Sequence, residues 1–190
     1  MQTTLNKIRA HSPCAEGWEK LLKYLGETKA DDEPLSLLTI LDSNGLDDAL
    51  WCFRAIEGRD KEIRLYAVWC ARQVQNLTKD PRSIAALDMA ERFANGEATE
   101  EELAKAWYAA WAAANAASWA AVCDSSWASA GATKSAAAWA AALAAVCDEA
   151  WAAVCDAAWA AANAAGMAAV RAAQAARLRE VCNEVQGVKQ

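Results

Sequence analysis

Residues that break helices and residues that favour strands are both scarce in this sequence. Among 190 residues there are three prolines, eight glycines, two phenylalanines and three tyrosines. Collagen-like, mucin-like and sandwich-like chains need more of these residues, so we exclude all three. Intrinsic disorder is excluded as well, because 55% of the residues are hydrophobic. Alanine, with fifty residues, and tryptophan, with ten, are abundant instead, which predicts an all-α protein.

Residues with catalytic or metal-binding chemistry are also few. The sequence has one histidine, His11, and none of its seven cysteines belongs to a CxxC pair. His11 and Cys14 have the spacing of half a metal site, or of a nucleophile and its base, but no second half accompanies them. Phosphate-loop, dinucleotide, zinc-protease, hydrolase and calcium-loop motifs are missing too. We therefore expect a protein that is not an enzyme and that binds no metal or cofactor.

Two Trp-Cys pairs, Trp51-Cys52 and Trp69-Cys70, recur in the N-terminal half. They have the residue types of redox or metal positions, but free cysteine is also a small hydrophobe and tryptophan a large one. We interpret both pairs as core. Cysteines that stay free fit a reducing cytoplasm, which is the expected location.

Negative charge is concentrated in the N-terminal half. The formal net charge is −6, and residues 1–103 account for all of it, with 13 Lys/Arg against 19 Asp/Glu. A chain without a basic patch does not suit nucleic acid, and Lys134 is the only positive charge between Lys105 and Arg171 in the tryptophan region. A basic protein partner fits better, although mild acidity also serves solubility.

Two acidic groups are the candidates for contact with such a partner. They comprise Asp31, Asp32, Glu33, Asp47 and Asp48. As paired carboxylates they would suit acid–base catalysis, but both groups are expected at helix N-termini, where negative charge is favoured in any case. If they form the contact surface, binding should weaken steeply with salt.

No segment predicts a membrane span. The longest uncharged stretch covers the 18 residues from 106 to 123, but alanine dominates it, and Asn115 and Ser118 interrupt it. The N-terminus has no apolar run of the kind that a secretory signal needs. We expect no membrane contact.

Start and stop signals divide the N-terminal half into short helices. The signals are Ser12-Pro13 and Gly26, then Asp32-Glu33-Pro34 and Asn44-Gly45, then Asp47 and Gly58, then Asp60, and last Asp80-Pro81 and Asn95-Gly96. The fourth helix has apolar residues at helical spacing from Ile63 to Leu77. No stretch alternates with period two, so no strands are expected.

The composition changes at a capping box, Thr99-Glu100-Glu101-Glu102. From residue 104 to residue 176, 38 of 73 residues are alanine. Tryptophans recur there at spacings that are multiples of four: Trp107, Trp111, Trp119, Trp127, Trp139, Trp151 and Trp159. The repeating unit is a tetrad of one distinctive residue and three mostly small ones.

A four-residue repeat drifts around a helix by about 40° per unit. These helices must therefore touch neighbours on more than one side or leave some tryptophans exposed. The polar stretch around Gly131 predicts a turn within residues 129–135, and the octads on either side have a reflected order. An antiparallel hairpin about residue 135 would pair Trp111 with Trp159, Trp119 with Trp151, Cys123 with Cys147, and Trp139 with Gly131. Slippage of a repetitive gene is the competing origin of the pattern.

The tryptophan stripe has two readings. Trp111, Trp119, Trp127, Trp139, Trp151 and Trp159 either pack inside the chain or form a surface for a partner or for a second copy. Fully burying one tryptophan removes roughly 200 Å² from water, which is worth on the order of 5 kcal/mol. Together with Trp107 they are seven, enough to bury a hairpin against the N-terminal domain or to build a dimer.

Residues 34–52 (PLSLLTILDSNGLDDALWC) and residues 63–72 (IRLYAVWCAR), followed by the Ala/Trp tetrads, have a distinctive pattern. In these segments the chain resembles an immunity protein group of bacteria and their phages. The resemblance covers roughly residues 10–185 and implies a small non-enzymatic protein that neutralises a toxin or a defence component by direct binding. Tetrads of that group often contain arginine, and this chain has no tetrads of that kind. The resemblance implies no catalytic residue.

The sequence thus predicts an all-α protein with two segments. Residues 1–98 form an acidic bundle of short helices, and residues 99–187 form an Ala/Trp helical hairpin and a closing helix that ends near Gly187. The expected function is a protein-binding inhibitor of the toxin-immunity or phage anti-defence (anti-CRISPR) type. The alternative is a structural protein that assembles with itself through its tryptophans.

Overall fold

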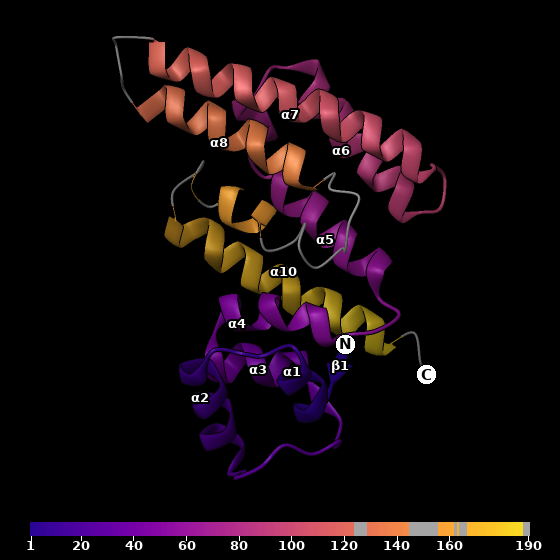
Figure 1. Ribbon diagram of the computed structural model, residues 1–190, viewed down its shortest axis with the longest axis vertical. Helices are drawn as coiled ribbons and strands as arrows, with labels where there is room; N and C mark the ends of the chain where they lie inside the picture. Colours follow the sequence, from indigo (N-terminus) through magenta and orange to yellow (C-terminus); the bar gives the residue numbers. More distant parts are fainter. Residues whose placement is uncertain (124–128, 145–155, 162, 164–166, 188–190) are drawn as a thin grey trace. The chain divides into compact units, whose positions relative to one another are not determined.

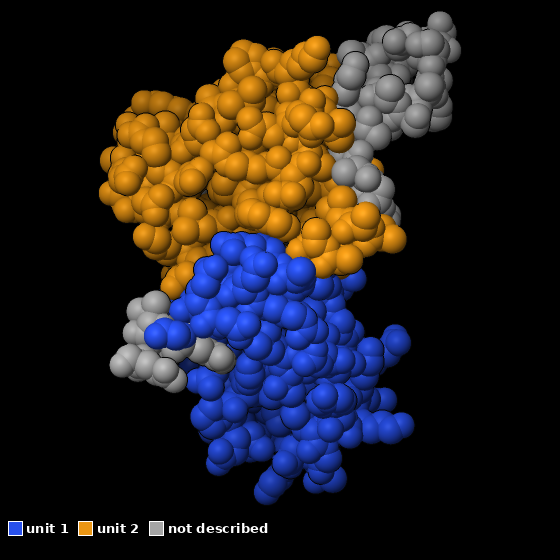
Figure 2. Space-filling model, turned by 180° about the vertical axis from the view of Figure 1, so that it is seen from behind, with its two compact units in different colours: residues 1–59, 175–190 blue, residues 60–174 orange. Residues whose placement is uncertain are grey.

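The computed structural model has an all-α fold, as the composition predicts (Figure 1). It describes residues 1–123, 129–144, 156–161, 163 and 167–187. None of the helices within these ranges is long and apolar enough to cross a membrane. The chain forms two compact units, which Figure 2 shows in different colours: unit 1 is Met1–Arg59 with Ala175–Gln190, and unit 2 is Asp60–Gln174.

The compact units have other boundaries than the two segments expected from composition. The change in composition at residue 99 falls inside unit 2, just before a long helix, and unit 1 takes in the end of the chain. Whether residues 1–98 and 99–187 fold separately stays a prediction.

Unit 1 contains short helices and a very small sheet. Its elements are β1 (Gln2–Thr3), α1 (Leu5–Ala10), α2 (Ala15–Leu25), β2 (Leu35–Ser36), α3 (Leu37–Asn44), α4 (Leu46–Trp51), the 3₁₀ helix η1 (Cys52–Ala55) and the C-terminal part of α10 (Met167–Gly187). The apolar sides of α1 and α3 are buried, with Leu5, Ile8, Leu37 and Ile40 at most 2% exposed. Burial of these stripes, more than helix propensity, stabilises such short helices.

The expectation that the chain has no strands is wrong, because unit 1 contains one pair of short strands. β1 and β2 are antiparallel, with Gln2 opposite Ser36 and Thr3 opposite Leu35. The hydroxyl of Thr3, a buried residue, donates to the main-chain oxygen of Ala55 (2.6 Å), which ties β1 to η1. Strands of two residues are too short to show an alternating pattern in the sequence.

Two helix starts in unit 1 differ from the expected ones. α2 is capped by Cys14, whose Sγ accepts from the main-chain N–H of Gly17 (3.4 Å), and not by Ser12. α3 starts at Leu37 with Ser36 as its cap, so the acidic stretch at residues 31–33 precedes β2 and does not open a helix. The expected end of α2 is confirmed, because Gly26 closes it in the left-handed conformation at φ 74°.

Unit 2 is built from longer helices. They are α5 (Asp60–Arg72), α6 (Pro81–Ala94), α7 (Glu100–Cys123) and α8 (Ser129–Ala144). The unit also contains the short 3₁₀ helix η2 (Gln75–Leu77), helical residues 156–161 and the first part of α10. α8 packs against α5, α6 and α7 (Figure 1). This central position confirms that an Ala/Trp helix touches neighbours on more than one side.

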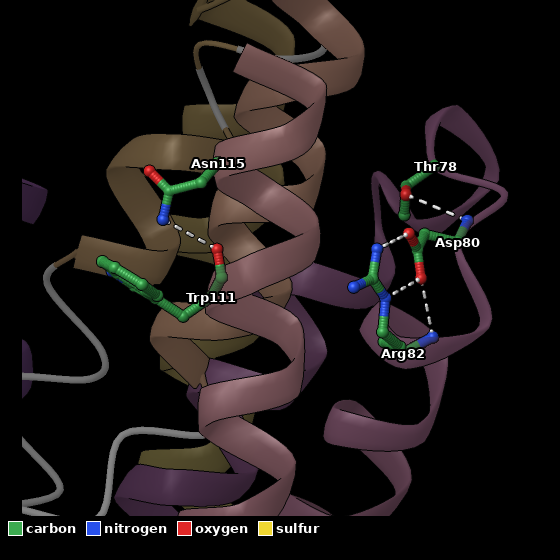
Figure 3. A network of polar contacts seen from close by, with 5 residues as sticks. All are labelled: Thr78, Asp80, Arg82, Trp111 and Asn115. Carbon is green, nitrogen blue, oxygen red and sulfur yellow. Dashed lines mark hydrogen bonds and ion pairs between the residues drawn. The ribbon is translucent and has the colours of Figure 1, made fainter. Parts of the chain in front are cut away.

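The caps of α6 and α7 are those that the sequence predicts. Asp80 accepts from the main-chain N–H of Arg82 (2.9 Å), with proline at the first helical position (Figure 3). At α7, the main-chain N–H of Thr99 donates to Glu102 (2.9 Å), and the N–H of Glu102 donates to the Thr99 hydroxyl oxygen (3.2 Å). Two helix N–H groups are thereby satisfied by one reciprocal pair.

The turn predicted within residues 129–135 is wrong. α7 ends at Cys123 and α8 begins at Ser129, so residues 129–135 are helical. The register differs as well, because the indole N–H of Trp139 donates to the hydroxyl oxygen of Ser118 (3.1 Å) rather than lying opposite Gly131. Propensity alone would disfavour Gly131 in a helix, but packing of α8 against three helices outweighs that cost.

Alanine is the most frequent buried residue among the described residues of unit 2. Among the described side chains of α8, the buried ones are Ala137, Ala138, Ala140, Ala141, Ala142 and Ala144, none more than 1% exposed. Ala142 joins a cluster with Ala86, Ala90, Leu103 and Ala110, against which Trp107 packs. Side chains this small let helix backbones approach closely.

Candidate functional site

A cavity of about 150 Å³ lies in unit 1, where α2, α3 and α4 meet. Most of its wall is apolar and is formed by Ile8, Trp18, Leu21, Ile40 and Trp51. These residues come from four different helices, so the cavity exists only in the folded unit. Its small volume is below the roughly 300–1,000 Å³ of cavities that hold cofactors or drug-sized ligands.

One part of the cavity wall is polar and negatively charged. Asp48 lies in the first turn of α4, and its Oδ2 accepts a hydrogen bond from the side-chain amide of Asn44 (2.7 Å). The same amide donates to the main-chain oxygen of Gly17 (2.8 Å), while the Ser43 hydroxyl donates to the amide oxygen (2.8 Å). These bonds orient the amide and hold α2, α3 and the Asp48 carboxylate together.

Gly17 allows α2 to lie close to this carboxylate. A Cβ at position 17 would lie 2.8 Å from Oδ2 of Asp48 and 3.1 Å from Sγ of Cys14. Both distances are shorter than ordinary van der Waals contacts, so any larger residue at position 17 would displace the side chains of Asp48 and Cys14. Glycine within a helix lowers its stability by about 1 kcal/mol relative to alanine. At position 17 it allows α2 to lie close to the Asp48 carboxylate.

Two cations of unit 1 lie near the cavity, but each is engaged elsewhere. The Lys20 ammonium donates to the main-chain oxygen of Asn44 (3.3 Å), and the Arg54 guanidinium lies over the Trp51 ring, 4.1 Å from its centroid. In the part of the chain that the structure describes, no lysine or arginine pairs with the Asp48 carboxylate. Asp48 is also the only charged residue among those described as lining the cavity.

The structure places the five predicted contact residues in different settings. Asp31 accepts from the main-chain N–H of Glu33 (3.2 Å), and Asp32 accepts from the Thr4 hydroxyl (3.4 Å), so these carboxylates belong to the connection before β2. Asp47 is exposed in the first turn of α4. Asp48 alone of the five lines the cavity. Their role in partner contact stays a prediction.

His11 and Cys14 are both exposed, His11 at the C-terminal end of α1 and Cys14 at the N-cap of α2. Within the described ranges, no group of three or more His, Cys, Asp or Glu residues has the arrangement of a metal site. Cys52 and Cys70 are buried, at 3% and 0% exposure, as their interpretation as core requires. Burial raises the pKa of the Cys70 thiol to about 12, although the Tyr66 hydroxyl and the Arg171 charge oppose that rise.

The tryptophan stripe is divided between the interior and the surface. Trp111 is 46% exposed and Trp159 is 51% exposed, whereas Trp107 and Trp139 are half-buried. Figure 3 shows Trp111 and Asn115 projecting from the same side of α7, where the Asn115 amide donates to the main-chain oxygen of Trp111 (3.0 Å). The predicted positions of Trp119, Trp127, Trp151, Cys123 and Cys147 lie outside the described side chains.

Comparison with known proteins gives no family for this chain. No protein-family model, curated protein or solved structure matches it. Its function must therefore be argued from the cavity of unit 1 and from the exposed aromatic side chains of unit 2.

Sequence reasoning missed the cavity and its residues Trp18, Asn44 and Trp51. One signal was present in the sequence: Gly17 stands in the first turn of an otherwise strong helix, where glycine often marks a close approach of another group. The partner in that approach, Asp48, lies 31 positions further along the chain, and no local pattern connects the two.

Proposed function

We propose that this chain is a non-enzymatic protein that binds another protein and blocks it by covering its surface. The observation that supports this proposal is the exposure of large aromatic side chains in unit 2. The smallest apolar side chains, such as Ala110 and Ala114, are completely buried, while Trp111 and Trp159 are about half exposed. Large apolar side chains that remain in water are typical of binding surfaces.

The energy available from these side chains is substantial. Full burial of a tryptophan removes roughly 200 Å² from water, so the exposed half offers about 2–3 kcal/mol per ring to a partner. Tyr108, which is 63% exposed, extends the aromatic surface of α7 next to Trp111. The centroid of its ring lies 4.5 Å from the centroid of the Trp107 ring. Aromatic residues on a helix lose little conformational entropy on binding, because their side chains have few torsions.

The proposed class of function is inhibition of the toxin-immunity or phage anti-defence (anti-CRISPR) kind. It is supported by the resemblance of residues 34–52 and 63–72 to immunity proteins and by the acidic character of the N-terminal half. A basic partner would be attracted at long range by these charges, and the apolar contact would then hold it. Affinity that is the same at low and high salt would contradict the electrostatic part.

A capture experiment with matched variants tests the proposal. The tagged full chain is incubated with a lysate of the organism that encodes it at low and at high salt, and the bound proteins are identified by mass spectrometry. We expect one stoichiometric, salt-sensitive partner, retained by the wild type and lost with Trp111→Ala combined with Trp159→Ala. Tyr24→Ala is the control, because it removes a side chain of similar exposure, 59%, from unit 1.

The alternative is a structural protein that uses the same tryptophans to bind a second copy. The exposure of Trp111 and Trp159 supports self-assembly as well as it supports binding of another protein. The molecular mass of the protein in solution distinguishes the two functions. Sedimentation of an assembly that dissociates when Trp111, Trp119, Trp151 and Trp159 become alanine would support it. A monomeric wild type would exclude it.

A further inference from the structure

The cavity of unit 1 has the size and the charge of a receptor for one side chain. Its volume of about 150 Å³ suits a group of a few non-hydrogen atoms and is too small for a cofactor. Its wall is apolar except where Cys14, Asn44 and Asp48 contribute polar atoms. An occupant should therefore have an apolar stem and one polar end.

The polar end of the occupant should be a cation. Asn44 binds Oδ2 of Asp48, and among the described residues no lysine or arginine neutralises this carboxylate. Lys20, which is close enough to reach Asn44, donates to the main-chain oxygen there instead. A carboxylate at the edge of an apolar cavity attracts a positive charge more strongly than one in open water.

An aromatic ring is also in place for such a cation. Trp18 and Trp51 both line the cavity, and Trp51 already has the Arg54 guanidinium over its ring. Trp18 therefore provides the ring for an incoming cation, together with apolar surface for its stem. Lysine and arginine side chains combine these two features, and anchoring side chains of this kind often fill small pockets at protein interfaces.

We propose that this cavity binds one basic side chain, lysine or arginine, of the partner protein, with its charge on Asp48 and its stem between the apolar walls. The proposal rests on the proposed function, since it names the group through which the partner is held. It also separates Asp48 from the other four acidic residues: Asp48 anchors, whereas Asp31, Asp32, Glu33 and Asp47 act through their general charge.

The test uses n-butylammonium, which reproduces a lysine side chain without its backbone. Binding to the full chain is followed by NMR through the indole N–H signals of the ten tryptophans, with that of Trp18 assigned from Trp18→Phe. We expect saturable movement of the Trp18 signal by n-butylammonium and much weaker movement by n-butanol, its neutral counterpart. Equal binding of both compounds, or binding of neither, would overturn the proposal.

Two matched variants test the carboxylate itself. Asp48→Asn keeps the shape of the side chain and should lower the affinity for n-butylammonium about tenfold or more. Asp47→Asn makes the same change of net charge one residue away, outside the cavity lining, and should leave the affinity nearly unchanged. Equal losses in the two variants would show a general charge effect and would overturn the proposal. Thermal unfolding of both variants verifies that they are folded.

The capture experiment separates this inference from the proposed function. Suppose that a partner is captured, and that Asp48→Asn weakens its binding no more than Asp47→Asn does. The proposed function then holds, but the proposal that the cavity binds a basic side chain of the partner is wrong. If n-butylammonium binds through Asp48 but the chain captures no partner, the proposed function fails and, with it, the assignment of the cavity to a protein side chain. In that case the cavity is a site for a free amine.

Discussion

The carboxylate of Asp80 shows what a single helix cap contributes. The Arg82 guanidinium and the main-chain N–H of the same residue hold the pKa of Asp80 below its ordinary value of 3.8. A carboxyl group whose pKa is lowered by folding stabilises the protein above that ordinary value, and the stabilisation is lost as pH falls through the lowered pKa. The charge therefore matters at neutral pH and not in strong acid.

We expect Asp80→Asn to destabilise the chain at pH 7 and to have a diminishing effect as the pH is lowered below about 4. Asparagine still caps the helix, so the difference reports the charge alone. Asp80→Ala, which also removes the cap, should cost about 0.5–2 kcal/mol more. Urea unfolding of the three proteins from pH 7 to pH 3 measures these differences. If the difference in free energy of unfolding between the wild type and Asp80→Asn stayed constant over this pH range, the lowered pKa of Asp80 would be contradicted.

The cysteines should differ strongly in reactivity. Cys14 is exposed, whereas Cys70 is fully buried with its pKa raised to about 12, so its reactive thiolate is scarce as well as inaccessible. Iodoacetamide applied to the native chain should modify Cys14 and leave Cys70 unmodified until the chain is unfolded. Peptide mass spectrometry follows each site separately. Modification of Cys70 in the native chain as fast as Cys14 would show that its burial is wrong.

At the scale of helices, the sequence predicts what is decided locally. α6 begins after Asp80 and ends before Asn95-Gly96, and α7 begins at its capping box, because these signals act on N–H and C=O groups a few residues away. The start of α3 was misplaced because proline and acidic residues resemble a helix start equally well in a loop. No turn forms within residues 129–135, because contacts of α8 with α5, α6 and α7 stabilise this stretch as a helix.

The alanine packing of α8 gives a sharp prediction at this scale. Ala142 is completely buried within a cluster from α5, α6 and α7, so Ala142→Leu should destabilise the chain by about 1–3 kcal/mol through overpacking. Ala112→Leu on α7 is the control: the same substitution at an exposed position should have little effect. Thermal or chemical unfolding compares the two. Equal losses would contradict the close packing of α8.

At the scale of the molecule, unit 1 is assembled from both ends of the chain. Leu178 on α10 is completely buried, and Arg179 next to it pairs with Asp42 of α3. Composition could not reveal this closure, because it depends on contacts between residues more than one hundred positions apart. The cavity was hidden as well, because no local sequence pattern shows that α1, α2, α3 and α4 come together to form its wall.

Substitution of Leu178 and of Arg179 shows whether apolar burial or the ion pair stabilises the packing of α10 in unit 1. Leu178→Ala should cost about 2–5 kcal/mol, the usual loss for a large buried side chain. Arg179→Ala should cost less than about 1 kcal/mol, because both side chains of its ion pair are 47% exposed to screening water. Urea unfolding of both variants measures the difference. A larger loss for Arg179→Ala would mean that the ion pair, not apolar burial, holds the end of the chain.

The alanine interior of unit 2 also sets the kind of inherited change that the gene can accept. In most proteins the damaging mutation of a core shortens a side chain, but a buried alanine has only one methyl group to lose. Every amino-acid replacement that one base change of an alanine codon can cause makes the side chain larger, charged or unfit for a helix. Natural variants should therefore keep alanine at Ala140, Ala141 and Ala142, while exposed positions such as Ala112 diverge freely. At these buried positions, selection should therefore act mainly against larger side chains.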